Sequence, residues 1–128
     1  MDALGALRAA HRRMIAENPI TITISRTERV EQDGAFAEVM NQHGPHTVRL
    51  FQSLSLRSVR EVTVTPGTKQ TDSRWGLAAD EGADLRAGPD VTDEFEAAGV
   101  GSFRVTAVYP LMLAGAIYGY QAELERVS

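Results

Sequence analysis

The spacing of apolar residues changes once along the chain, from the period of a helix to the period of strands. In the first stretch the spacing is three or four residues, and the resulting stripe contains Leu4, Leu7, His11, Met14 and Ile15. Asp2 is a suitable N-cap. Proline disfavours helical backbone in the residue before it, so the Asn18-Pro19 step ends the element. The pattern predicts a helix over about residues 2–17, whose stripe docks on its own sheet or on a neighbouring subunit.

Beyond Pro19 apolar and polar residues alternate, which is the pattern of half-buried strands. The expected strands lie at about residues 20–25 with a continuation to 30, then at 35–42, 47–52, 61–65, 92–96, 101–110 and 116–124. An Asp-Gly turn at residues 31–34, a loop at 43–46 and a turn at 110–115 separate them. One helix followed by about six or seven short strands predicts a mainly β fold, a small β-barrel or sandwich with an N-terminal helix.

The last two expected strands carry half of the aromatic residues. Their apolar faces contain Phe103, Val105, Ala107 and Tyr109 on the first strand, and Tyr118, Tyr120, Ala122 and Leu124 on the second. A hairpin alone is marginal in water, so this one needs the upstream strands as a partner sheet. We expect Val105 and Leu124 in the core of a barrel over about residues 20–127, within a single domain of residues 1–128.

The alternation dissolves between about residues 67 and 91, apart from a candidate brief strand at 77–79. An irregular connection of this length is uncommon in a compact domain and is often functional or disordered. Its front part carries Lys69 and Arg74, and its rear part carries Asp80, Glu81, Asp84 and Asp90. Trp75 lies between them and either anchors a contact with a partner or plugs the barrel.

Composition and charge narrow the class of protein. The 128 residues suffice for one domain with a real core, and the absence of cysteine excludes disulfides and thiolate chemistry. The net charge of −4 is uneven, because residues 1–30 are basic and residues 77–128 are acidic. The longest apolar run is broken by Pro110 and Gly115 and is too short to span a bilayer, and no secretory signal is visible. We expect a soluble intracellular protein without a membrane partner.

The residue types that carry chemistry do not assemble into a catalytic motif. His43 and His46 form part of a metal-ligand set, but no cysteine or third histidine lies nearby, so loop histidines are the better interpretation. The Gly67-Thr-Lys sequence lacks the leading glycine and the following helix of a phosphate-binding loop. The carboxylates Asp93, Glu94 and Glu96 are interpreted as a solvated face. The sequence therefore predicts no enzyme activity, no metal and no cofactor.

Six segments together resemble one protein family. They are Leu7-Arg-Ala-Ala-His-Arg-Arg-Met-Ile-Ala-Glu-Asn-Pro19, Gly44-Pro-His-Thr-Val-Arg-Leu-Phe51, Trp75-Gly-Leu-Ala-Ala79, Thr92-Asp-Glu-Phe95, Phe103-Arg-Val-Thr-Ala-Val-Tyr-Pro110 and Tyr118-Gly-Tyr-Gln-Ala-Glu-Leu124. With them, the chain resembles the head-closure proteins of long-tailed bacteriophages, also called stopper or head–tail joining proteins. The resemblance covers most of the chain.

This resemblance implies a structural virion protein of the phage neck that is present in the host cytoplasm during assembly. It implies a ring of identical subunits with twelvefold or sixfold symmetry, bound to portal and adaptor proteins above and to the tail terminator or tail tube below. Packaged double-stranded DNA would pass through the channel without sequence-specific contacts. The resemblance places the expected loop, with Lys69, Arg74, Trp75, Asp80, Glu81 and Asp84, at the channel or the tail interface. It makes the helix stripe of Leu4, Leu7, His11 and Met14 a docking surface for a subunit or the adaptor.

Two other classes of protein remain open at this point. A tail terminator or head–tail adaptor of the same machine is the nearest, although an adaptor should be mostly helical. A single-strand nucleic-acid-binding β-barrel is the alternative from another class, and it needs a basic groove with stacking aromatics. The aromatic hairpin lies in the acidic half of the sequence, which argues against that alternative.

Overall fold

A computed structural model describes residues 2–54 and 73–128, and within them the chain forms one helix and six antiparallel strands. The elements are α1 (Ala3–Ala16), β1 (Ile20–Gln32), β2 (Ala35–Leu54), β3 (Ser73–Ala79), β4 (Val91–Ala97), β5 (Gly101–Leu113) and β6 (Ala116–Arg126). The strands close into a barrel in the order β1-β2-β3-β6-β5-β4. The predicted mainly β fold with an N-terminal helix is therefore confirmed, as a barrel. The strand predicted at residues 61–65 lies outside the described residues.

The core of the barrel is filled by the inward-facing residues of all six strands. Val105 and Leu124 are among them, with 3% and 8% of their surface exposed, as predicted. Trp75 packs on Phe103 with ring centroids 4.9 Å apart, and Phe103 stacks on Phe95 at 5.6 Å. Trp75 thus packs on the core as a residue of β3 and not from a loop, and its predicted role as a contact anchor stays a prediction.

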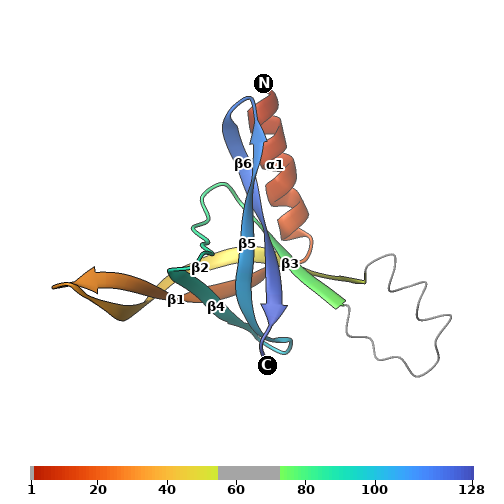
Figure 1. Cartoon of the computed structure of the whole chain (residues 1–128). Helices are drawn as coiled ribbons and strands as arrows, with labels where there is room; N and C mark the ends of the chain where they lie inside the picture. The colour runs from red at the N-terminus through yellow and green to blue at the C-terminus, as the bar shows by residue number, and fades with distance from the viewer. Residues whose placement is uncertain (1, 55–72) are drawn as a thin grey trace.

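Helix α1 covers the outer side of the barrel over β6, β3 and β2 (Figure 1). Asp2 caps its N-terminus by accepting a hydrogen bond from the backbone N–H of Gly5, as the sequence predicted. His11 is buried, and its Nε2 lies 2.8 Å from the carbonyl oxygen of Ala79. Its ring fills the space above Gly119, where a Cβ atom would overlap it. The helix stripe therefore docks on the chain's own sheet through His11 and Ile15.

The loop predicted at residues 43–46 is wrong, because β2 runs without interruption from Ala35 to Leu54. Residues 43–46 form a bulge in the β1–β2 ladder, which shifts register between Ile22 and Ile24. Gly44 supplies a φ of 122°, which glycine adopts at low cost, and the Gly44–Pro45 peptide bond is cis. Glycine and proline predict the end of a strand, but here they form a bulge within one.

The turn predicted at residues 110–115 is too long. Pro110 lies within β5, paired with Tyr120, and the reversal occurs at Ala114 and Gly115, with φ values of 51° and 82°. A second bulge between Val105 and Ala107 changes the face of the following residues. As a result Val108 packs on the core, whereas Tyr109 is exposed, contrary to the predicted alternation.

The long irregular segment predicted at residues 67–91 is also wrong in its middle. Residues 73–79 form β3, which pairs with both β2 and β6 and closes that side of the barrel. Only residues 80–90 form an irregular connection, and residues 67–72 lie outside the described part of the chain. Gly76 and the small residues Ala78 and Ala79 weakened the strand signal, because small side chains leave little apolar periodicity to detect.

Candidate interaction surfaces

The β1–β2 hairpin projects beyond the barrel, and we call its free part, residues 29–38, the β1–β2 arm (Figure 1). The last pair between β1 and β4 joins Glu28 and Val91, and the N–H of Arg29 still donates to the carbonyl oxygen of Asp90 at 2.8 Å; beyond Arg29, within the described residues, β1 pairs with β2 alone. Phe36 on this arm and Met40 at its base are 63% and 69% exposed. The arm reverses at Asp33 and Gly34, with φ values of 51° and 81°, the Asp-Gly turn predicted from the sequence.

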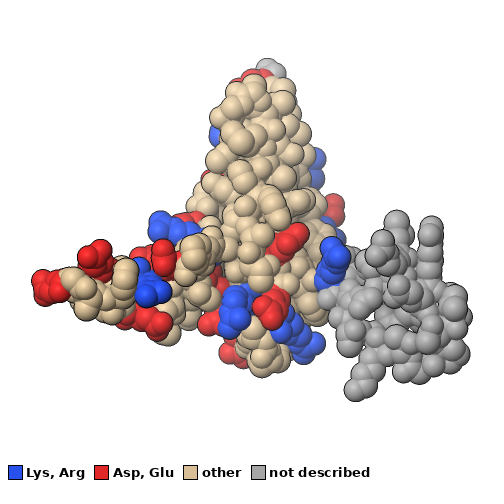
Figure 2. All heavy atoms as spheres, in the orientation of Figure 1, with Lys and Arg blue, Asp and Glu red and all other residues tan. Residues whose placement is uncertain are grey.

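A second arm is formed by the far end of the β5–β6 hairpin, residues 111–119, beyond the last pair between β3 and β6, and it lies beside α1 (Figure 1). Residues 105–122 contain no Asp, Glu, Lys or Arg. The arm is accordingly almost free of charge in the view of Figure 2, whereas the β1–β2 arm carries charges of both signs. Tyr109 at its base and Met112 on it are 49% and 53% exposed. Both arms thus present large apolar side chains to solvent.

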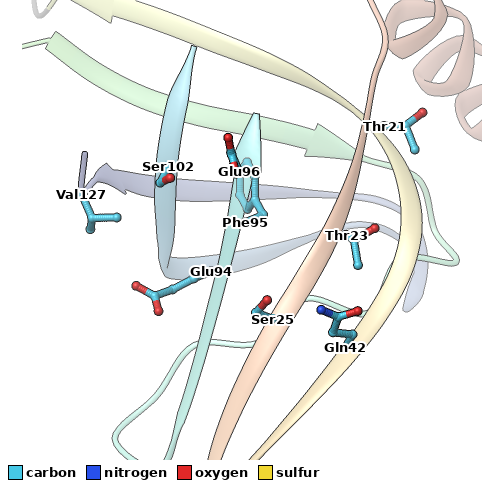
Figure 3. A pocket seen from close by; sticks show the side chains of 9 residues that line it. All are labelled: Thr21, Thr23, Ser25, Gln42, Glu94, Phe95, Glu96, Ser102 and Val127. Carbon is cyan, nitrogen blue, oxygen red and sulfur yellow. The ribbon is translucent and has the colours of Figure 1, made fainter. Parts of the chain in front are cut away.

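A polar groove lies on the outer face of the barrel between β1 and β4, and we call it the β1–β4 groove (Figure 3). Its volume is about 510 Å³, and its lining consists of Thr21, Thr23, Ser25, Gln42, Glu94, Phe95, Glu96, Ser102 and Val127. In Figure 3 the two strands run side by side near Ser25 and separate toward Thr21 and Glu96. The groove combines a row of hydroxyl groups on β1 with two carboxylates on β4.

A buried ion pair lies at inward positions of the same two strands. Arg26 and Asp93 are 1% and 0% exposed, and the guanidinium donates two hydrogen bonds to the carboxylate, of 2.7 and 2.9 Å. Arg26 also donates to the Asp84 side chain at 3.1 Å and to its carbonyl oxygen at 3.0 Å. The hydrogen bonds from Arg26 lower the pKa of Asp84, and those to Asp93 are the main cause that raises the pKa of Arg26.

This ion pair fixes the connection between β3 and β4. The second oxygen of Asp93 accepts a hydrogen bond of 2.7 Å from the backbone N–H of Arg86. The Arg86 side chain in turn lies 3.6 Å from the Glu28 carboxylate on β1. The network therefore holds residues 84–86 against β1 at the base of the β1–β2 arm.

The prediction of a solvated face for Asp93, Glu94 and Glu96 is wrong for Asp93. Its position was readable from the strand period, because it shares a face with Phe95 and Ala97, which are both buried. Arg26 likewise shares the inward face of β1 with Ile22 and Ile24. A positive charge at an inward position of one strand and a negative charge at an inward position of another are the signal that would have suggested this ion pair.

The structure distributes the residues predicted for the channel or tail interface over separate places. Lys69 lies outside the described residues, Arg74 is exposed on β3, and Trp75 faces the core. Asp80 accepts a hydrogen bond from the Gly82 N–H at 2.9 Å, whereas Glu81 pairs with Arg12 of α1. Their role at a channel or tail interface stays a prediction.

The predicted docking stripe on α1 is divided in the structure. His11 is 8% exposed and lies against the chain's own barrel, so in this packing it offers a partner little surface. Leu4, Leu7 and Met14 are half-buried at the margin of the same contact. A role of these three residues in binding a subunit or an adaptor stays a prediction.

A metal site, a membrane-spanning helix or a similar known protein would each indicate a function. In the described part of the chain, no group of three or more His, Asp or Glu side chains is arranged to hold a metal ion. Among the described residues no helix has the length and apolarity needed to cross a membrane. Compared with known protein families, with curated proteins and with solved structures, the chain gives no match.

Proposed function

We propose that this protein is a structural subunit of a phage head–tail connector, which forms a ring under the portal and adaptor, closes the DNA-filled head and docks the tail. The observation that carries the proposal is the pair of arms that project from a small barrel and expose large apolar side chains. The resemblance of six sequence segments to head-closure proteins is the reason for assigning the protein to a phage head–tail connector. On this proposal the protein acts in the virion neck and has no catalytic step.

The exposed side chains of the arms favour an assembly over an isolated monomer. A two-stranded ribbon is marginal in water, so the β1–β2 arm gains stability when a partner covers Phe36 and Met40. The same gain holds for Tyr109 at the base of the β5–β6 arm and for Met112 on it, because burial of apolar area contributes about 25 cal/mol per Å². The two arms differ in charge and sequence, so a contact between them joins different surfaces of neighbouring copies. Such head-to-tail contacts close into a ring when the rotation per subunit divides a full turn.

The distribution of charge is compatible with a conduit for double-stranded DNA that does not bind it tightly. The net charge is −4, and DNA affinity depends largely on the number of phosphates that Lys and Arg neutralise. The alternative of a single-strand nucleic-acid-binding barrel needs a basic groove. The polar groove of this barrel instead carries Glu94 and Glu96, which repel phosphates. The acidic groove therefore argues against a single-strand nucleic-acid-binding barrel.

Fractionation of particles tests the proposal and separates it from its nearest alternative. Heads, free tails and complete virions of a phage that encodes this chain are purified separately, and the chain is quantified in each by mass spectrometry. A head-closure subunit is present in DNA-filled heads and in virions but absent from free tails. Recovery with free tails would identify a tail terminator, and absence from virions would refute both assignments.

A further inference from the structure

The ladder between β1 and β4 stops although both strands continue. The last pair toward this end joins Ser25 and Glu94, and β4 then extends for three more residues to Ala97. Continued pairing would place Ile24, Thr23 and Ile22 opposite residues 95–97. Instead, within the described residues, this part of β1 pairs only with β2, and this part of β4 pairs only with β5. The barrel is therefore split locally along one seam.

The bulge in β2 accounts for the split. The β1–β2 register shifts between Ile22 and Ile24, opposite Gly44 and Pro45, at the level where the β1–β4 ladder is lost. A bulge bends its strand pair and increases the local twist. β1 follows β2 away from β4 in consequence, and the β1–β4 groove fills the space between them (Figure 3).

We propose that the β1–β4 groove is a strand-addition site that binds an extended segment of a partner protein. A strand without a neighbour presents a row of backbone N–H and C=O groups, and here two such rows face one groove. Extended peptides bind at sheet edges through these backbone groups, and side-chain pockets give specificity.

The side chains that line the groove select a basic, polar segment. Glu94 and Glu96 line it from β4, and no Lys or Arg is among the lining residues. The Glu94 carboxylate is already 3.2 Å from Arg104, so Glu96 is the carboxylate more available to a bound cation. Thr21 and Thr23 add hydroxyl groups that donate to or accept from polar side chains. The preferred occupant is an extended segment with Lys or Arg at alternate positions, since alternate residues of a strand face the same side.

This inference goes beyond the proposed function and stands independently of it. It concerns recognition of a peptide segment and holds whether the protein acts in a phage neck or in another assembly. The carboxylates disfavour a nucleic acid as the occupant, because its phosphates carry the same sign of charge.

The experiment uses the full-length protein, labelled with ¹⁵N, and a nine-residue probe peptide of alternating Lys and Val with blocked ends. Binding is followed by the amide signals in NMR spectra. We expect saturable shifts at Thr21, Thr23 and Glu96, with protection of these amides from hydrogen exchange. Two matched probes serve as controls, one with Glu in place of Lys and one with N-methylated backbone at alternate residues. Both controls should bind at least tenfold more weakly than the Lys–Val probe.

Two charge-reversed variants complete the test. Glu96→Lys should weaken binding of the Lys–Val probe about threefold to tenfold, as expected for loss and reversal of an exposed charge contact. Glu38→Lys, on the exposed face of the β1–β2 arm, should leave the affinity unchanged. Absence of binding at millimolar probe, equal binding of the N-methylated probe, or shifts confined to other residues would each overturn the proposal. Self-association of the protein at this groove, or tighter binding of a single-stranded oligonucleotide than of the Lys–Val probe, would also overturn it.

Discussion

Removal of the Asp93 carboxylate should cost this protein a large part of its stability. In Asp93→Ala, Arg26 would remain at a position where 1% of its surface is exposed, with two of its hydrogen bonds lost. Breaking a buried ion pair in this way typically costs about 3–5 kcal/mol. Asp84 would still contact the guanidinium, so we expect the lower end, about 3 kcal/mol. That is a large share of a total stability of about 5–15 kcal/mol and lowers Tm by roughly 10 °C.

Urea unfolding followed by Trp75 fluorescence and circular dichroism measures the effect, with the m-value checked for constancy. Glu94→Gln on the same strand is the matched control, because its pair with Arg104 is exposed and should contribute at most about 1 kcal/mol. The double variant Arg26→Met/Asp93→Leu removes both charges and should recover most of the loss. A loss below about 1 kcal/mol in Asp93→Ala, or a double variant less stable than the single one, would refute the reasoning.

Three further predictions follow from the packing and the charges. Gly119→Ala should destabilise the fold by about 1–3 kcal/mol in urea unfolding, because a Cβ there overlaps the His11 ring, and an unchanged midpoint would contradict that contact. Val105→Asp should prevent cooperative folding, because it places an unpaired charge in the core; a soluble variant with a cooperative thermal transition would contradict the strand assignment. Asp84→Asn should be less stable than wild type at neutral pH, and the difference should shrink as acid titrates Asp84 below its ordinary pKa of 3.8, since Arg26 lowers that pKa in the folded state. A difference that persists unchanged to pH 2 in denaturant titrations would contradict this linkage.

The sequence predicted those elements that can be recognised from residues close together in the chain. The helix stripe, the Asp2 cap and the proline at residue 19 define α1, and regular alternation defines the start of β1 and the inner half of β5. Val105 and Leu124 were placed in the core for the same reason. Such features depend on residues a few positions apart, so they are visible without knowledge of the fold.

The elements that were missed depend on contacts between distant parts of the chain. Gly44 and Pro45 are equally compatible with a loop and with a bulge, and only the pairing of β2 with β1 before and after them selects the bulge. The β1–β4 groove could not be predicted, because it follows from that bulge together with the register of a strand about 70 residues away. The acidic neighbours Glu94 and Glu96 favoured a solvated face for Asp93, although the strand period placed it on the inward face.

The most direct test of the central claim is an electron cryomicroscopy map of the neck of a phage particle that encodes this chain. If the protein is a ring-forming subunit of the neck, the map will show several copies of the six-stranded barrel in a closed ring between the portal and the tail. The ring should have twelvefold or sixfold symmetry, and the β1–β2 arm and the β5–β6 arm should lie in contacts between protein subunits. A neck without this barrel, a single copy away from the channel axis, or copies whose two arms both face solvent would contradict the account.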